Sequence, residues 1–175
     1  MTREDLKRFR ALKLDFESIG LIQQEENEPY FCTPLGAEYV GWIGCDGVHF
    51  ILLPGDERVF CVDPAMGEPG SYVLPVAENF RTFLSYVLFC RDANPLSQIW
   101  WLSEERFRQL LAEDGEADWP GCQEFLARKA QALECLRTEF SIAPADPYEA
   151  VKTLQSDFDP AVLIFSPEYY ETLGL

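Results

Sequence analysis

The stretch EYVGWIGCDGVHFILLPGDERVFCVDPAMGEPGSYVLPVAENFRTFLSYVLF, residues 38–89, decides the fold. Its first part consists of short runs rich in β-branched and aromatic residues, and Gly, Pro and Asp separate these runs. Such a pattern is typical of strands that tight turns connect. The Asp46-Gly47 pair favours the tight reversal of a hairpin. We expect strands over residues 39–43, 48–53, 58–63 and 71–76, with the second at the centre of the sheet.

After residue 76 the spacing of the apolar residues changes from two to about 3.6. They then fall at Phe80, Phe83, Leu84, Val87 and Leu88, which share one side of a helix. We therefore expect a helix over residues 79–89 whose apolar side packs across the sheet.

The flanking sequence predicts helices on both sides of this block. Before it, apolar residues at helical spacing indicate an amphipathic helix over Thr2 to Ile22 that is irregular past Lys13, and Tyr30-Phe31-Cys32 suits a short edge strand. After it, we expect helices to begin near Pro95, Ser103, Trp119, Pro147 and Pro167, and an acidic loop over residues 113–118. Strands followed by helices predict a single α+β domain over residues 1–175, with helices on one face of a mainly antiparallel sheet and a helical C-terminal part over residues 95–175.

The composition of the chain indicates which classes of partner and which cellular compartment to expect. No window approaches the roughly 18 apolar residues of a membrane span, and residues 1–7 lack the apolar region of a secretory signal, so we expect a cytoplasmic protein without membrane contact. The 30 acidic and 14 basic residues give a net charge of −16, which argues against binding to nucleic acid. Such a charge favours solubility, and it also suits a basic protein partner.

The sequence offers little support for a metal or a cofactor. The six cysteines form no C-x-x-C pair, so we expect reduced, structural thiols. The glycines match no phosphate-binding loop. Carboxylates that could bind Mg²⁺ or Ca²⁺ lie where strands end, at Asp46, Asp56, Glu57 and Asp63. Their spacing matches no calcium loop, and turn formation explains Asp46 and Asp56 without a metal. We expect neither a metal nor a cofactor.

His49, in the middle of the central strand, is the only histidine. It shares a face with Ile51 and Leu53 by alternation. A thiol beside an imidazole can act as a nucleophile, so a small hydrolase or thiol enzyme that uses His49 with Cys45 or Cys61 is one hypothesis. The alternative is an imidazole hydrogen-bonded within the sheet, which is far commoner.

Two places suit a protein partner. The turns after the first two strands carry Asp46, Asp56 and Glu57, and Trp42 offers an aromatic anchor. Alternation places Trp42 on the opposite sheet face from Tyr39. The alternative is that Trp42 belongs to the core and that the acids only form turns. The second place is Trp100-Trp101, since adjacent helical residues cannot both face one core.

Three motifs in residues 38–90 resemble the SUKH superfamily, which includes fungal cell-wall-synthesis regulators and bacterial immunity proteins. They are Gly41-Trp42-Ile43-Gly44-x-Asp46-Gly47, Val59-Phe60-x-Val62-Asp63-Pro64 and the helix start Val76-Ala77-Glu78-Asn79-Phe80-Arg81-Thr82-Phe83-Leu84. The resemblance implies an α+β fold that has no catalytic residues and binds a protein partner, often a bacterial toxin. An acidic immunity protein that neutralises a basic toxin domain is the function that this resemblance and the charge suggest together.

Overall fold

The computed structural model describes residues 1–114 and 118–175. In these residues the elements follow in the order α1 (Thr2–Arg10), η1 (Glu17–Ile19), β1 (Glu38–Trp42), β2 (His49–Leu52), β3 (Val59–Val62), β4 (Val73–Ala77), α2 (Phe80–Cys90), α3 (Asn94–Gln98), α4 (Glu104–Asp114), α5 (Cys122–Phe140), α6 (Tyr148–Ser156), η2 (Pro160–Val162) and α7 (Pro167–Leu173). The predicted α+β class is confirmed.

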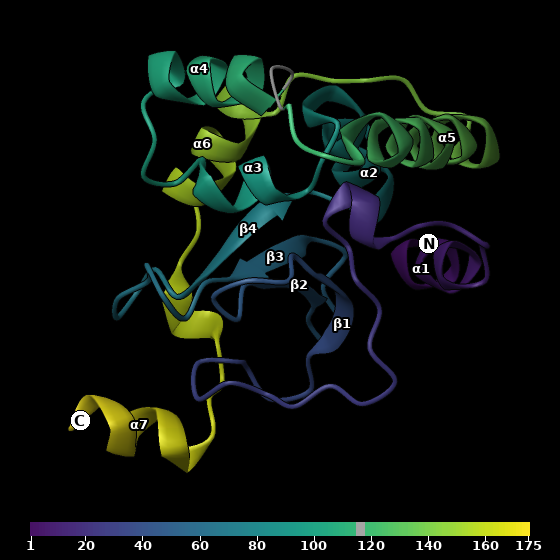
Figure 1. Ribbon diagram of the computed structural model, residues 1–175. Coiled ribbons are helices and arrows are strands. Elements are labelled where there is room, and N and C mark those ends of the chain that lie inside the picture. Colours follow the sequence, from purple (N-terminus) through teal and green to yellow (C-terminus); the bar gives the residue numbers. More distant parts are fainter. Residues whose placement is uncertain (115–117) are drawn as a thin grey trace.

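The four strands form one antiparallel sheet in the order β1-β2-β3-β4 (Figure 1). The four predicted strands are confirmed, with small differences at their ends. β2 lies between β1 and β3, and all its residues are buried. This explains why residues 48–53 form an almost unbroken apolar run, since a strand covered on both faces has no solvent side to make polar.

The larger apolar core lies between the sheet and the helices α1 to α6 (Figure 1). The predicted helix over 79–89 is confirmed as α2, whose residues Phe80, Phe83 and Leu84 are fully buried. The Asn79 side chain accepts a hydrogen bond from the Thr82 backbone N–H at 3.0 Å and so caps the helix start. The burial of this apolar side holds α2 on the sheet.

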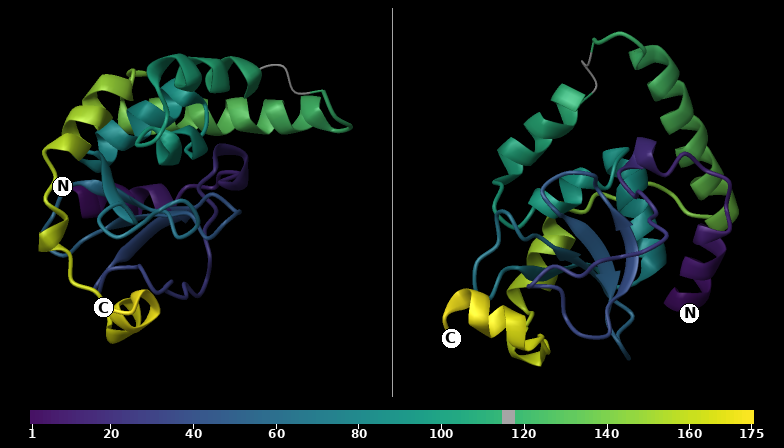
Figure 2. Two further views of the ribbon diagram at one scale, coloured as in Figure 1. Left: turned by 90° about the vertical axis from the view of Figure 1, so that its left-hand side faces the viewer. Right: turned by 60° about the horizontal axis from the view of Figure 1, so that its bottom comes forward.

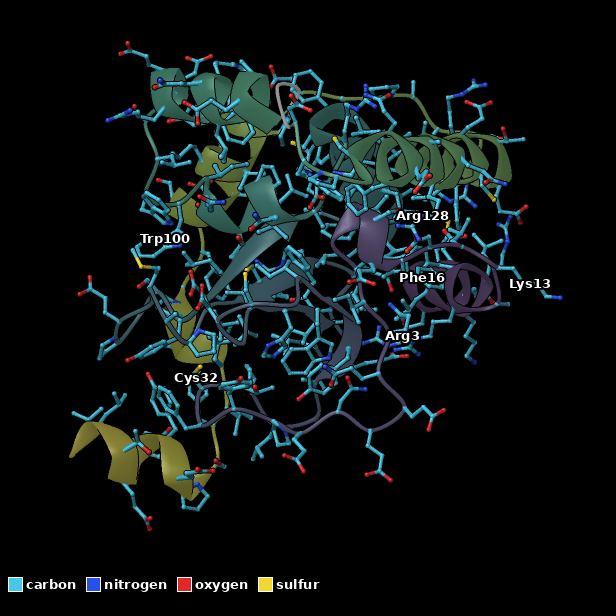
Figure 3. All side chains as sticks on the ribbon, viewed as in Figure 1. Arg3, Lys13, Phe16, Cys32, Trp100 and Arg128 are labelled. Atoms are coloured by element: carbon cyan, nitrogen blue, oxygen red, sulfur yellow. The ribbon has the colours of Figure 1, made fainter. Side chains whose placement is uncertain are left out.

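A second, smaller core covers the opposite face of the sheet. It contains Ile51 of β2, Phe60 of β3 and Tyr169 of α7, together with Cys32 from the loop before β1. Figure 3 shows Cys32 on the side of the sheet where the C-terminal segment runs. Figure 2 shows α7 at the opposite end of the molecule from α4 and α5. The large helices therefore cover one face, while a loop and the C-terminal segment cover the other.

The helix predicted from Thr2 ends at Arg10, before the irregularity that the sequence predicted past Lys13, so the prediction of a helix as far as Ile22 is wrong. Asp15 explains part of the change, because its Oδ1 accepts a hydrogen bond from the Ser18 backbone N–H and its carbonyl accepts one from the Ser18 hydroxyl. Such local bonds compete with helix formation. The apolar residues of this segment still pack on the larger core. Their spacing therefore predicted correctly that they are buried, and incorrectly that they form a helix.

The predicted edge strand at Tyr30-Phe31-Cys32 is also wrong, because these residues form a turn in which the Thr33 N–H donates to the Tyr30 carbonyl at 2.8 Å. Ile22 takes the place beside β1 instead. It exchanges two backbone hydrogen bonds with Trp42, of 2.8 and 3.0 Å. Pairing by a single residue covers part of the strand edge without adding a strand.

The predicted C-terminal helices are all present as α3 to α7. The acidic loop expected over residues 113–118 is replaced at its start by α4, which continues to Asp114, and its residues 115–117 lie outside the described residues. Trp100 and Trp101 lie in a turn after α3 rather than within a helix. Within residues 1–114 and 118–175, no helix combines the length and the apolar character needed to cross a membrane.

Candidate functional site

The turn between β1 and β2 has the geometry expected of an Asp-Gly hairpin. Asp46 and Gly47 both have positive φ, of 53° and 69°, and the Val48 N–H donates to the Cys45 carbonyl at 3.1 Å. Two consecutive positive φ values define the turn that matches the twist of a hairpin. Asp46 is exposed at the tip of this turn, as its position in the sequence predicted.

The prediction that Trp42 faces away from Tyr39 is wrong, because β1 contains a bulge. Tyr39 pairs with Ile51 and Gly41 pairs with Phe50, so Val40 has no partner of its own in β2. The extra residue shifts the alternation by one position. The rings of Tyr39 and Trp42 consequently stack on the same face, with centroids 5.4 Å apart and planes at 15°.

This face of the sheet carries a cluster of four rings, those of Tyr30, Tyr39, Trp42 and His49. The His49 ring lies 4.2 Å from Trp42 and 5.2 Å from Tyr39, and Tyr30 lies 6.0 Å from Trp42. His49 is fully buried and Trp42 is 6% exposed, whereas Tyr30 is 42% exposed. Tyr30 is therefore the ring that this cluster presents to solvent.

His49 joins the two segments that flank the cluster. Its Nδ1–H donates to the Gly47 carbonyl at 2.7 Å, which leaves Nε2 to accept from the Thr33 hydroxyl at 3.3 Å. The Thr33 Oγ1 in turn accepts a hydrogen bond from the Tyr30 N–H at 3.0 Å. A continuous chain of hydrogen bonds thus links the loop at Tyr30 to the hairpin turn at Gly47 through the imidazole.

Burial is the main influence on the titration of this cluster. It lowers the pKa of His49 from 6.5 to about 4, although the hydrogen bond to the Gly47 carbonyl acts in the opposite direction. Burial also raises the pKa of Tyr39, while the nearby Thr33 hydroxyl lowers it. His49 is consequently neutral at pH 7, which suits the hydrogen-bond chain described above.

A cleft of about 660 Å³ opens beside the exposed ring of Tyr30. We call it the acidic cleft, because Glu26 and Glu28 line it from the loop before β1 and Asp46 lines it from the hairpin turn. Its remaining lining residues are Gln24, Tyr30, Trp42, Gly44, Cys45, Gly47 and Val48. No Lys or Arg is among these described residues, so the lining of the cleft carries three acidic residues and no basic one.

The loop that forms one wall of the acidic cleft is fixed to the sheet by side chains. Trp42 Nε1–H donates to Asn27 Oδ1 at 2.7 Å, and Gln23 Nε2 donates to the Val40 carbonyl at 2.8 Å. Gly47 allows the other wall to approach closely, since a Cβ there would lie 2.3 Å from Cζ of Tyr30. The cleft is therefore pre-formed in the free protein.

Asp56 and Glu57 lie at the opposite end of β2 from Asp46, because consecutive turns of an antiparallel sheet alternate between its ends. Asp56 makes an ion pair with Arg58 at 2.7 Å, and Glu57 accepts a hydrogen bond from the Thr2 N–H at 2.9 Å. These contacts lower the pKa of both carboxyl groups, against the opposing effect of burial at Asp56. The structure thus brings Trp42 and Asp46 together and separates them from the other two predicted residues.

The two candidate thiols differ in their position relative to His49. Cys61 is buried in the larger core, on the face of the sheet that carries the helices, whereas His49 faces the other side. Cys45 is exposed in the hairpin turn. Burial raises the pKa of both thiols, with Asp46 adding to the shift at Cys45 and Asp63 to that at Cys61. Nucleophilic thiols need the opposite shift.

The remaining candidate features are the cysteines, a metal site and the Trp100-Trp101 pair. Cys32, Cys45, Cys61, Cys90 and Cys135 are free thiols. Among the described residues, no group of three or more His, Cys, Asp or Glu side chains is arranged to hold a metal ion. Trp101 is 43% exposed beside a shallow groove of about 310 Å³, while the buried Nε1 of Trp100 has no hydrogen-bond partner in the part of the chain that the structure describes.

Glu26, Glu28 and Tyr30 form much of the acidic cleft and were not predicted from the sequence as site residues. The signal was present as a polar, acidic loop that ends in an aromatic residue. No residue pattern in the sequence indicates that this loop folds back beside the hairpin turn.

No family model, no curated protein and no solved structure matches this chain.

Proposed function

We propose that this protein is a binding module without catalytic activity, and that the acidic cleft receives a basic segment of a protein partner. The observation that carries the proposal is the combination of Glu26, Glu28 and Asp46 around the exposed ring of Tyr30 in a pre-formed cleft without Lys or Arg in its lining. Carboxylates that face a positively charged partner favour rapid encounter and reject acidic competitors.

The charge of the whole chain supports the same proposal. A net charge of −16 extends an attractive field toward a basic protein well beyond the cleft itself. The resemblance of residues 38–90 to the SUKH superfamily suggests a biological role for such a binding module, that of an immunity protein that neutralises a basic toxin domain. In this proposal Asp46 belongs to the binding surface, and the buried Trp42 supports the Tyr30 ring beside it. Glu57 holds the start of α1, and Asp56 holds the turn before β3.

Support for the non-catalytic proposal over a thiol enzyme comes from His49. Both of its ring nitrogens already serve the hydrogen-bond chain between Gly47 and Thr33. A rapid reaction of Cys45 with iodoacetamide at pH 7 that His49→Ala abolishes would favour the enzyme. The proposal expects slow labelling that is insensitive to His49→Ala once unfolding is excluded.

The direct test measures binding of a short peptide that contains two Lys and two Arg residues. The cleft variant carries Glu26→Gln, Glu28→Gln and Asp46→Asn. The control variant carries Glu105→Gln, Glu124→Gln and Glu149→Gln, which removes the same charge from exposed sites on α4, α5 and α6. We expect the cleft variant to bind about tenfold more weakly, equivalent to about 1.4 kcal/mol, and the control variant to change affinity by less than about threefold. Equal losses in both variants would locate no site and contradict the proposal.

A further inference from the structure

The exposed ring of Tyr30 occupies a fixed position in the acidic cleft. Its backbone N–H donates to Thr33 Oγ1, and its ring lies so close to Gly47 that a Cβ there would be within 2.6 Å of Cε1 and Oη. Trp42 packs beside it at 6.0 Å, with the two planes tilted by 48°. A ring held in this way offers a flat surface without first losing conformational freedom.

The three carboxylates of the acidic cleft are available to a ligand. Glu26 and Glu28 precede Tyr30 on one wall, and Asp46 lies on the other wall. In contrast to Asp5, which pairs with Arg81 at 2.7 Å, none of the three makes an ion pair or a side-chain hydrogen bond within residues 1–114 and 118–175. The cleft therefore combines a flat aromatic surface with unpaired negative charge on two sides.

We infer that the group that this cleft recognises is an arginine side chain of the partner, stacked on Tyr30 and hydrogen-bonded to carboxylates on the two walls. This inference rests on the proposed function and specifies its ligand. A guanidinium is planar, weakly hydrated and able to stack on an aromatic face, and its N–H groups point outward in its plane toward carboxylates. A lysine ammonium is more strongly hydrated and has no flat face to stack, so it gains less from Tyr30.

The test compares two short peptides of the same length and charge, one with four Arg and one with four Lys. Their affinities are measured by calorimetry for the wild type, the cleft variant, Tyr30→Leu and Tyr30→Phe. We expect the Arg peptide to bind the wild type about tenfold more tightly than the Lys peptide. Tyr30→Leu should remove most of this preference, whereas Tyr30→Phe keeps the ring and should preserve it.

The outcomes separate the inference from the proposed function. Equal binding of both peptides, with both affinities reduced in the cleft variant, would overturn the arginine inference and leave the basic-partner proposal standing. A preference for Arg that Tyr30→Leu leaves unchanged would also overturn it. Binding of neither peptide, or binding that the cleft variant leaves unchanged, would overturn both. Unfolding midpoints of each variant, measured alongside, establish that the substituted proteins remain folded.

Discussion

The two faces of the sheet carry different kinds of side chain. The helical face buries a continuous set of aliphatic and Phe side chains from α1 to α6. The other face is covered by a loop and the C-terminal segment, and it carries His49, two Tyr rings and Trp42 in one cluster. The first face holds the larger apolar core, whereas the second combines a smaller apolar core with polar groups, close backbone approaches and the acidic cleft. The difference suggests that the larger part of the apolar stabilisation comes from the helical face and that binding belongs to the other face.

The largest effect on stability is expected on the helical face. Phe83 of α2 is fully buried and its ring lies 5.0 Å from that of Phe50 in β2. Phe83→Ala should therefore lower the free energy of unfolding by about 3 to 5 kcal/mol, because it removes buried apolar contacts and leaves a cavity. Urea denaturation measures this loss, and a midpoint close to that of the wild type would place Phe83 outside the core.

A somewhat smaller effect on the free energy of unfolding is expected when the pH is lowered, because His49 lies on the second face. The folded pKa of His49, about 4, lies below its ordinary value of 6.5, so the unfolded chain binds the proton more readily. The stability that this difference contributes is complete above pH 6.5 and is lost as the pH falls toward 4. The shift corresponds to about 3 kcal/mol over this range.

Denaturation at a series of pH values checks this prediction against His49→Gln. The variant should be less stable than the wild type at pH 7 and should show a flatter dependence between pH 6.5 and 4. The pKa values of Asp5 and Asp56 are lowered, so the stability that their ionised forms contribute is lost at pH values below this window. Parallel curves for the two proteins would show that His49 titrates normally in the folded state.

A still smaller effect on stability is expected from the glycines of the two hairpin turns. Gly47 and Gly55 both have positive φ, but a Cβ would meet the ring of Tyr30 only at Gly47. Each substitution to Ala should cost about 1 kcal/mol through its backbone conformation. Only Gly47→Ala should also displace Tyr30 and weaken binding of the Arg peptide, which calorimetry measures. Equal affinities in the two variants would show that the position of Tyr30 does not matter for binding.

The sequence predicted the helical face of the sheet better than the face that carries the acidic cleft. Local spacing was sufficient for the strands and for α2, because period-2 and period-3.6 patterns report directly on burial. It failed at Trp42, since the bulge at Val40 shifts the alternation without leaving a signal in residue type. It also failed to assemble the cleft. Glu28 and Asp46 come together only through long-range contacts, such as the hydrogen bond between Asn27 and Trp42.

The most direct test of this division is the free energy of unfolding of the cleft variant, measured with and without the Arg peptide. Without the peptide, the variant should be at least as stable as the wild type, because the three carboxylates have no partner among the described residues and removing them reduces repulsion. At a peptide concentration 100 times the dissociation constant of the wild type, the wild type should gain about 2.7 kcal/mol and the variant about half of that or less. A variant that gains as much as the wild type, or that loses several kcal/mol without the peptide, would contradict the assignment of binding and stability to opposite faces.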